Sequence, residues 1–322
     1  MTMRSSSKGS LGIALIAALL AACDGTAPPP SAPLPVAESL NARSANPPPP
    51  WIRPGAANGP LLYVSSLWTR AVYIFSYPRL ELVGMLGEYG WEPVAICSDQ
   101  KGNVFVPMYD LAKTFEFAHG GTQPIASLKL PGSYPYSCAF DPTTGNLAVA
   151  AGFYNGGNRV AIYASAKGKP TTYSDPYIAS NPLCGYDDQG NLFVDGGGKS
   201  KGFILSELGK GAKTFSEITV NQEISSNGNV QWDGKYVTVL DGTHGVIYRL
   251  KIAGSYATVV GSTALNDAGA IYGSWIQGHH VIAPDEAHGR ARIYGYPAGG
   301  DAVKTTTVQE AFSVTVSVAP TR

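Results

Sequence analysis

The stretch Cys184–Asp195, CGYDDQGNLFVD, occurs in altered form twice earlier in the chain. ICSDQKGNVFVP spans Ile96–Pro107, and CAFDPTTGNLAVA spans Cys138–Ala150. In each copy an apolar run ends in Asp, a turn containing Gly-Asn follows, and a second apolar run begins. Gly and Asn supply the positive φ that a tight hairpin turn requires. Each phrase therefore predicts two antiparallel strands, and we expect its Asp to cap the turn between them.

The hairpin belongs to a longer repeat. Its first strand ends at five aligned positions, 42, 46, 46 and 43 residues apart, which are Asp99, Asp141, Asp187, Asp233 and Ile276. A second strand, a third strand with an aromatic residue and a fourth strand follow in each unit, although the third strand of the fourth unit offers only GFILSE. A period in the forties with four short strands is the signature of β-propeller blades.

The two ends of the repeat complement each other. The first unit starts at Leu61–Ser66 and lacks a first strand, whereas Phe312–Val318 is a surplus strand that alternates with period two. We infer that the surplus strand becomes the innermost strand of the first blade, which removes an exposed sheet edge. The sequence thus predicts an all-β fold: a six-bladed β-propeller over residues 60–320 whose C-terminal strand closes the first blade.

The register P-x-x-x-x-x-D-x-x-G-N-hydrophobic-x-V, clearest at Pro93–Val106, resembles NHL-type and SMP-30/gluconolactonase-like six-bladed propellers. The resemblance covers about Leu61–Val318. It implies the architecture and leaves the activity open, because one fold hosts many functions.

The composition of the chain limits the classes of partner that we expect it to bind. The 322 residues carry 23 basic and 23 acidic side chains, so the formal net charge is zero. Because no net positive charge attracts the phosphates of nucleic acid, nucleic acid is not an expected partner. The 38 Gly, 24 Pro and 18 Tyr suit short strands and tight turns. We expect a monomer.

The N-terminal segment predicts export. Basic Arg4 and Lys8 precede the apolar run Leu11–Leu20, which is too short to span a bilayer. The sequence LAAC ending at Cys23 resembles the lipobox of bacterial lipoproteins. This resemblance implies that residues 1–22 are a signal peptide and that Cys23 carries a lipid. The protein would then be anchored to a bacterial membrane and face the periplasm or the cell exterior; the alternative is an ordinary secretory signal.

Residues 23–59 are rich in proline and poor in apolar residues, so they cannot form a packed core. We expect a semi-extended spacer that holds the propeller away from the membrane.

Three further cysteines, Cys97, Cys138 and Cys184, lie in apolar, strand-like stretches without metal-ligand spacing. We expect them to be buried as small hydrophobic residues. A disulfide between Cys138 and Cys184 is the alternative in an oxidising compartment.

One face of the disc is predicted to bind a ligand. In a propeller the loops that lead into the first strands and the loops between second and third strands open on the same face. The polar and aromatic residues there are Glu92, Tyr134, Asn181, Asn227, Asp267, Asp110, Asp195, Asp241, His244, Asp285, Glu286 and His288. Oxygen ligands at a channel mouth could hold Ca²⁺ or another divalent cation, which is the only cofactor candidate. The simpler interpretation is that Asp and Asn are turn residues.

Two functions follow. The first, which we favour, is a non-enzymatic module that binds a protein, peptide or glycan through this face. The second rests on the resemblance to SMP-30-like lactonases, which implies a metal held by Glu92, Asn181, Asn227 and Asp267, with Asp267 also acting as a base. The sequence departs from that family, because Pro follows Glu92 directly and Ala-Gly follows Asp267. Trp232 and Trp275, at matching positions of neighbouring inner strands, are expected to fill the space between blades.

Overall fold

The structure is a computed structural model that describes residues 49–87, 91–130, 132–152 and 158–319. The predicted signal peptide, Cys23 and most of the predicted spacer lie outside these residues. Within them, no helix is long and apolar enough to cross a membrane.

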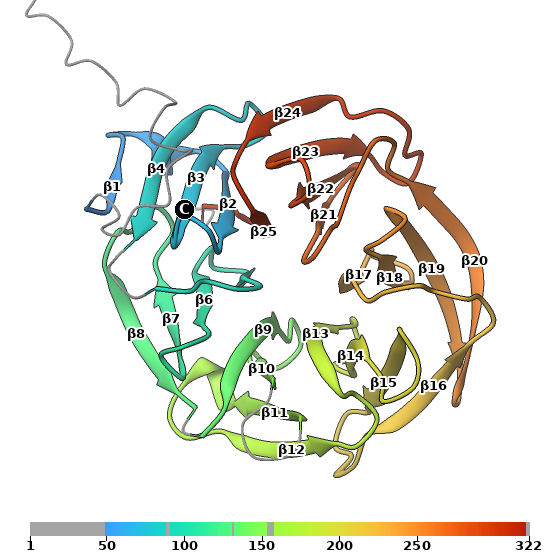
Figure 1. The fold of residues 1–322 in the computed structure, drawn as a ribbon. Coiled ribbons are helices and arrows are strands. Elements are labelled where there is room, and N and C mark those ends of the chain that lie inside the picture. Colours follow the sequence, from blue (N-terminus) through green and yellow to red (C-terminus); the bar gives the residue numbers. More distant parts are fainter. Residues whose placement is uncertain (1–48, 88–90, 131, 153–157, 320–322) are drawn as a thin grey trace, which may run out of the picture. The chain divides into compact units, whose positions relative to one another are not determined.

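The described residues form five hydrogen-bonded sheets arranged around a centre (Figure 1). The first runs β1(Trp51–Ile52), β4(Leu82–Gly87), β3(Ala71–Ser76), β2(Leu61–Ser66) and β25(Ala311–Ser317). The second runs β5(Cys97–Ser98), β6(Val104–Met108), β7(Lys113–Phe117) and β8(Pro124–Lys129). The third runs β9(Tyr134–Phe140), β10(Leu147–Gly152), β11(Asn158–Tyr163) and β12(Thr171–Asp175).

The fourth sheet has eight strands: β13(Ser180–Tyr186), β14(Leu192–Gly197), β15(Ile204–Leu208), β16(Ser216–Val220), β20(Tyr256–Ala264), β19(Val246–Ala253), β18(Val237–Asp241) and β17(Val230–Trp232). The last runs β21(Trp275–Gln277), β22(His280–Asp285), β23(Arg290–Gly295) and β24(Lys304–Thr307). Two short 3-10 segments, η2(Ala56–Asn58) and η3(Ala164–Ala166), complete the described elements. The predicted all-β, propeller-like architecture is confirmed.

The eight-stranded sheet consists of two antiparallel sets of four strands. They are joined only where the outer strands β16 and β20 pair in parallel, through Thr219 with Tyr256 and Val220 with Ala257. Tyr256 and Ala257 of β20 also pair with β19, in the part of the β19–β20 hairpin that extends past the end of β18. Hydrogen bonding therefore yields five sheets where the sequence predicts six blades.

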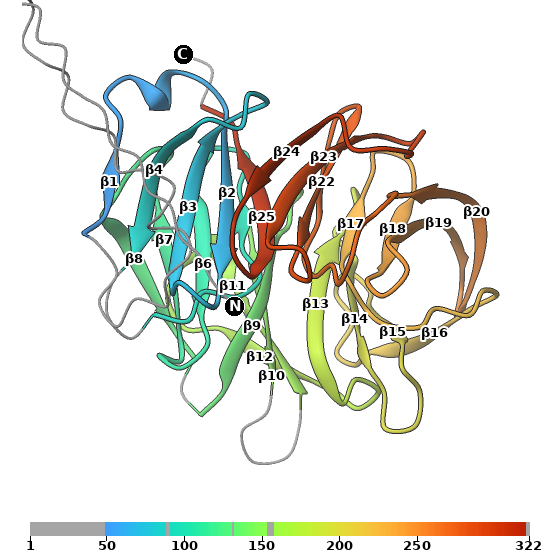
Figure 2. The same cartoon turned by 45° about the horizontal axis from the view of Figure 1, so that its top comes forward.

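The C-terminal strand lies beside the first described unit. β25 pairs antiparallel with β2, with Leu61 opposite Ser317 and Val64 opposite Val314 (Figure 2). β2 is buried along its whole length because β25 and β3 flank it and neighbouring sheets cover both of its faces. The strand β10, with the sequence LAVAAG, is likewise buried along its whole length, whereas outer strands such as β24, with the sequence KTTT, are largely exposed.

A short strand forms within the last part of the predicted spacer. Trp51 and Ile52 pair with Met85 and Gly84, so β1 adds a fifth strand to the outer edge of the first sheet. Trp51 also packs against the core between the first and last sheets. Its large apolar surface explains why the chain is ordered here despite the prolines that precede it.

The hairpin turns form with the predicted Asp caps, but only their Gly, and not the Asn that follows it, adopts positive φ. The Asp99 carboxylate accepts hydrogen bonds from the backbone N–H groups of Lys101 and Asn103 at 2.9 and 2.7 Å. Asp187 caps its own turn in the same way, and Gly190 adopts φ +84°. The recurring Asp of the opening phrase is therefore a turn cap.

Candidate functional site

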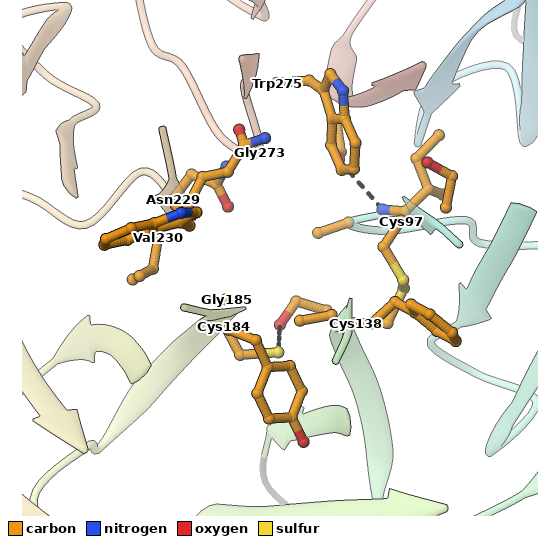
Figure 3. A pocket seen from close by; sticks show the side chains of 18 of the residues that line it. Cys97, Cys138, Cys184, Gly185, Asn229, Val230, Gly273 and Trp275 are labelled. Carbon is orange, nitrogen blue, oxygen red and sulfur yellow. Dashed lines mark hydrogen bonds between the residues drawn. A yellow bond between two sulfur atoms is a disulfide. The ribbon is translucent and has the colours of Figure 1, made fainter. Parts of the chain in front are cut away.

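The innermost strands enclose a cavity of about 470 Å³, here called the central cavity (Figure 3). Its wall includes residues of β5, β9, β13, β17, β21 and β25. It also reaches turns that follow these strands, at Gln100 and Pro142. The volume falls within the range of roughly 300–1,000 Å³ that is typical of small-molecule sites.

The side chains that line the central cavity are almost all uncharged. Its aromatic residues are Phe140, Tyr186, Trp232 and Trp275, and its amides are Gln100, Asn229, Gln231 and Gln277. Asp99 is the single carboxylate among the described lining residues, and it is engaged by its own turn. No Lys, Arg or His is among them. The cavity is therefore suited to a neutral group with both apolar and hydrogen-bonding surface.

Polar side chains join the innermost strands to one another. Gln231 donates to the Ile276 carbonyl at 3.1 Å and accepts from the Ile276 N–H at 2.7 Å. Asn229 donates to the Ser274 carbonyl at 2.6 Å. These strands have a sheet partner on only one side, so their inward backbone groups need side-chain partners. Asn229 and Gln231 are thus held in fixed positions.

Two of the innermost strands approach very closely at Gly185. A Cβ added to Gly185 would lie 2.2 Å from the carbonyl oxygen of Val230 on the neighbouring inner strand. Only glycine allows this contact between β13 and β17.

The aromatic residues of the wall have a regular origin. Phe140, Tyr186 and Trp232 each end an inner strand, opposite the first residue of the next strand. Each also packs against a core cluster between sheets, as Phe140 does by stacking on Phe105 with centroids 6.4 Å apart.

Trp275 is placed differently from the prediction. Ile276 lies opposite Val281, as Trp232 lies opposite Val237, so the structural equivalent of Trp232 is Ile276 and not Trp275. The alignment was wrong by one residue because the last unit has no Asp at the end of its first strand. Gln277 holds that position, eight residues before Asp285, as Asp233 stands eight residues before Asp241. Both tryptophans pack partly between sheets, as predicted, and both also line the central cavity.

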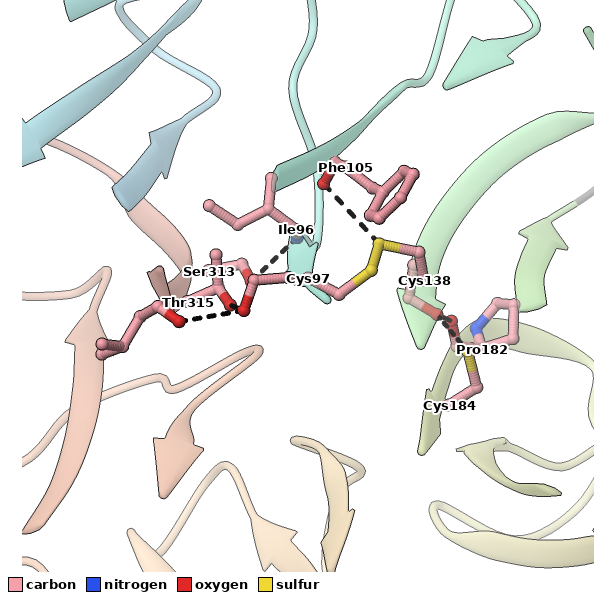
Figure 4. Close-up of a disulfide and its surroundings, with 11 residues drawn as sticks. Ile96, Cys97, Phe105, Cys138, Pro182, Cys184, Ser313 and Thr315 are labelled. Carbon is pink, nitrogen blue, oxygen red and sulfur yellow. Dashed lines mark hydrogen bonds between the residues drawn. A yellow bond between two sulfur atoms is a disulfide. The ribbon is translucent and has the colours of Figure 1, made fainter. Parts of the chain in front are cut away.

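The cysteine pairing also differs from the alternative considered. Cys97 and Cys138 form a disulfide with Cα atoms 5.7 Å apart, which links β5 to β9 (Figure 4). Cys184 is a buried free thiol, and burial raises its pKa to about 11. The Ser137 hydroxyl lies 3.5 Å from its sulfur. Successive residues of a strand point to opposite sides, so Cys138 faces Cys97 while Ser137 faces Cys184.

Aromatic rings bound the cavity on the side of the loops that lead into the first strands. Tyr272 stacks on Phe312 at 5.3 Å, and Tyr136 meets Phe312 edge-on at 5.8 Å. Tyr109 packs with them, and the buried cluster that they cover includes Ala95, which also lines the cavity. We call Tyr109, Tyr136, Tyr272 and Phe312 the aromatic plug.

None of the residues predicted for metal or ligand binding is among the described residues that line the central cavity. Asn227 donates to the Asn181 carbonyl at 2.7 Å, so the structure brings these two together. Glu92 pairs with Arg70 at 3.5 Å, and Asp267 pairs with Arg292 at 3.1 Å. Among the described residues, no three side chains of His, Cys, Asp or Glu gather in a way that could hold a metal. The four-residue ligand set stays a prediction.

Asn181 and Asp267 adopt φ of 50° and 55°, in the left-handed region. Asn and Asp tolerate this conformation better than most residues. Backbone geometry therefore accounts for both residue types without a ligand.

The predicted binding-face residues have local roles. His244 contacts the Asp241 carboxylate through Nδ1 at 2.9 Å, and His288 contacts Asp285 at the same distance. Burial alone would raise the pKa of Asp241, but hydrogen bonds from Ser225 and His244 outweigh it and lower that pKa.

The other members of that face differ in exposure. Tyr134 stacks on Tyr109 at 4.7 Å, and Asp110 is exposed. Glu286 is half-buried, and burial, aided by the nearby Glu310 charge, raises its pKa. Asp195 is fully buried, its Oδ1 has no hydrogen-bond partner among the described residues, and burial raises its pKa well above the usual value.

Sequence reasoning missed the central cavity because it searched loops and not strands. One signal was available in the sequence: the polar residues Asn229 and Gln231 stand next to and within the otherwise apolar strand β17. The 46-residue spacing of Phe140, Tyr186 and Trp232 was a second signal.

No protein-family model and no curated protein matches this chain. Solved structures do match it. One is a nidogen/laminin complex, with TM-score 0.67 and 9% identity over 82% of this chain and all of the matched chain. A second is a Bacteroides caccae protein of unknown function, with TM-score 0.59 and 13% identity over 80% of this chain and 99% of the other. A third is streptogramin B lyase, with TM-score 0.50 and 15% identity over 79% and 74%.

These likenesses define the class as a β-propeller. At such identities they show the fold alone, and the activities in their names remain those proteins' own.

Proposed function

We propose that this chain is a non-enzymatic, ligand-binding β-propeller whose central cavity takes one neutral saccharide unit of a glycan. A single observation carries the proposal. The six innermost strands, β5, β9, β13, β17, β21 and β25, all line one cavity of about 470 Å³. Sugars present flat apolar faces and many hydroxyls. Aromatic rings and fixed amides, such as those of Trp232, Trp275 and Gln231, are the matching groups.

The proposal includes six blades. It counts the eight-stranded sheet as two blades, because only two residue pairs join its halves. The pairing of β25 with β2 supports closure of the first blade by the C-terminal strand. The six inner strands found in the cavity wall agree with this number.

The proposal also includes tethering. The chain would be held at a bacterial membrane by a lipid on Cys23, facing the periplasm or the cell exterior, with the proline-rich spacer between anchor and propeller. Metabolic labelling with palmitate tests this in bacteria that express the chain. Label in the wild type and none in Cys23→Ser is the expected result.

Tryptophan fluorescence tests binding, because two of the five tryptophans line the cavity. Neutral oligosaccharides, acidic oligosaccharides and short neutral peptides would be titrated in parallel. We expect saturable changes with neutral oligosaccharides, weakened in Trp232→Phe and Trp275→Phe. Trp51→Phe, outside the cavity, serves as the matched control.

Peptide binding alone, or equal binding by all three variants, would refute the saccharide assignment. The metal-dependent lactonase alternative is checked with lactone substrates in the presence and absence of a chelator. Chelator-sensitive turnover that is lost in Asp267→Asn would establish the alternative.

A further inference from the structure

A second concave site lies on the perimeter, between the outer strand β8 and the strands β11 and β12. We call it the rim groove. It has a volume of about 500 Å³ and is lined by Ser127, Lys129, Leu130, Ser133, Arg159, Gly168, Lys169, Pro170 and Thr172. Figure 1 shows β8 and β12 following one another along the outside of the ring. The rim groove shares no lining residue with the central cavity.

The base of the rim groove consists of buried residues and hydrogen-bonded backbone. Leu130 is 5% exposed and Ser133 is 7% exposed. The Leu130 N–H donates to the Ala112 carbonyl at 2.9 Å, and the buried Tyr163 donates through its hydroxyl to the Lys129 carbonyl at 3.0 Å. The N–H and the C=O of the peptide group between Lys129 and Leu130 are therefore both held by hydrogen bonds.

The charged lining residues of the rim groove are all basic. Lys129, Arg159 and Lys169 are exposed, and no carboxylate is among the described lining residues. None of the three forms an ion pair within the described part of the chain. Lys129 also lies directly opposite Lys113 in the β7–β8 ladder, where like charges repel.

Some cations elsewhere in the described residues are paired with carboxylates. Arg249 meets Asp233 at 2.6 Å, and the buried Arg292 meets both Asp267 and Asp285. A second perimeter groove of about 420 Å³ contains Lys201, and there Glu217 lies 3.2 Å from the lysine nitrogen. The chain as a whole has no net charge, so the excess in the rim groove is local.

We propose that the rim groove binds a phosphate-bearing ligand. Lys129, Arg159 and Lys169 would neutralise the phosphate, and Ser127, Ser133 and Thr172 supply hydroxyl donors beside them. The volume exceeds that of a phosphate ion, so part of the attached group is enclosed too. The phosphate can come from a soluble phosphate ester or from an anionic lipid headgroup, which share this chemistry.

The test uses the full chain carrying Cys23→Ser, so that a lipid anchor cannot itself bind vesicles. The groove variant combines Lys129→Gln, Arg159→Gln and Lys169→Gln. The control variant combines Lys199→Gln, Lys213→Gln and Lys251→Gln, which removes the same charge from exposed positions outside the rim groove. All six side chains are exposed, so both variants are expected to fold, and circular dichroism verifies this.

Two probes are used at low ionic strength. Inorganic phosphate is titrated by calorimetry. Vesicles of phosphatidylcholine, or of equal parts phosphatidylcholine and phosphatidylglycerol, are tested by co-sedimentation. The groove variant should lose affinity by about tenfold or more relative to the control variant. High salt should weaken the binding of the wild type.

Groove-dependent binding to phosphatidylglycerol vesicles identifies a headgroup as the source. Groove-dependent binding to phosphate without vesicle binding identifies a soluble ester. The inference is overturned if neither probe binds the wild type, or if groove and control variants bind equally.

Discussion

Removing the Cys97–Cys138 disulfide should destabilise the domain strongly. The two cysteines are 41 residues apart, and the segment between them holds strands β5 to β8 and the start of β9. In the chain-entropy treatment, a cross-link that closes a loop of this size lowers the entropy of the unfolded chain by about 13 cal/mol/K. At 25 °C this corresponds to about 4 kcal/mol of stability, a large share of the 5–15 kcal/mol typical of a whole domain.

The assay is guanidinium denaturation followed by tryptophan fluorescence. The test variant combines Cys97→Ala and Cys138→Ala, and the matched control is Cys184→Ala, which removes a buried sulfur without touching the cross-link. The double variant should lose about 4 kcal/mol in free energy of unfolding, and the control only about 1 kcal/mol from lost packing.

Thiol alkylation without reduction gives an independent reading. In the unfolded wild-type chain, Cys184 should be modified, while Cys97 and Cys138 should react only after reduction. Equal stability of the two variants, or alkylation of Cys97 before reduction, would contradict the pairing.

Three further outcomes test other parts of the structure. Gly185→Ala should cost about 2–3 kcal/mol in thermal or denaturant unfolding, because its Cβ would meet the Val230 carbonyl, whereas Gly209→Ala, with no atom closer than 3.9 Å, should be nearly neutral. Asp195 keeps its proton in the folded state above pH 4, where the unfolded chain releases it. Wild-type stability should therefore fall by up to about 1.4 kcal/mol per pH unit as pH rises from 4 toward the folded pKa, and Asp195→Asn should remove this slope in unfolding curves measured from pH 4 to 7. Truncation before Ala311 removes β25 and should expose the edge of β2, so size-exclusion chromatography should show aggregation, and a stable monomer would argue against a closing role for this strand.

The fold was predictable because the sequence repeats one pattern of strands and turns along the chain. The Asp and Gly-Asn turn chemistry recurs at nearly constant spacing, and Leu61–Ser66 was located to the residue as β2. Trp51–Ile52 was missed because two residues in a proline-rich segment carry no strand pattern, and pairing with β4 and packing against the core order them. The merging of two strand sets depends on how the β19–β20 hairpin lies against β16, which turn signals do not encode.

The candidate site was less accessible to sequence reasoning. Loop residues such as Asn181 and Asp267 attracted attention as ligands, yet both stand at positions with positive φ that favour Asn and Asp in any case. The central cavity depends on which side of each inner strand faces the centre. Replacement of the recurring Asp by Gln277 in the last unit was enough to misplace Trp275 by one residue.

A co-crystal structure with the neutral oligosaccharide that binds most tightly tests the central claim most directly. The account predicts one sugar ring inside the central cavity, in contact with Trp232 or Trp275 and hydrogen-bonded to an amide of the wall. Electron density for the sugar only on the opposite side of the aromatic plug, among Glu92, Tyr134 and Asp110, would contradict it.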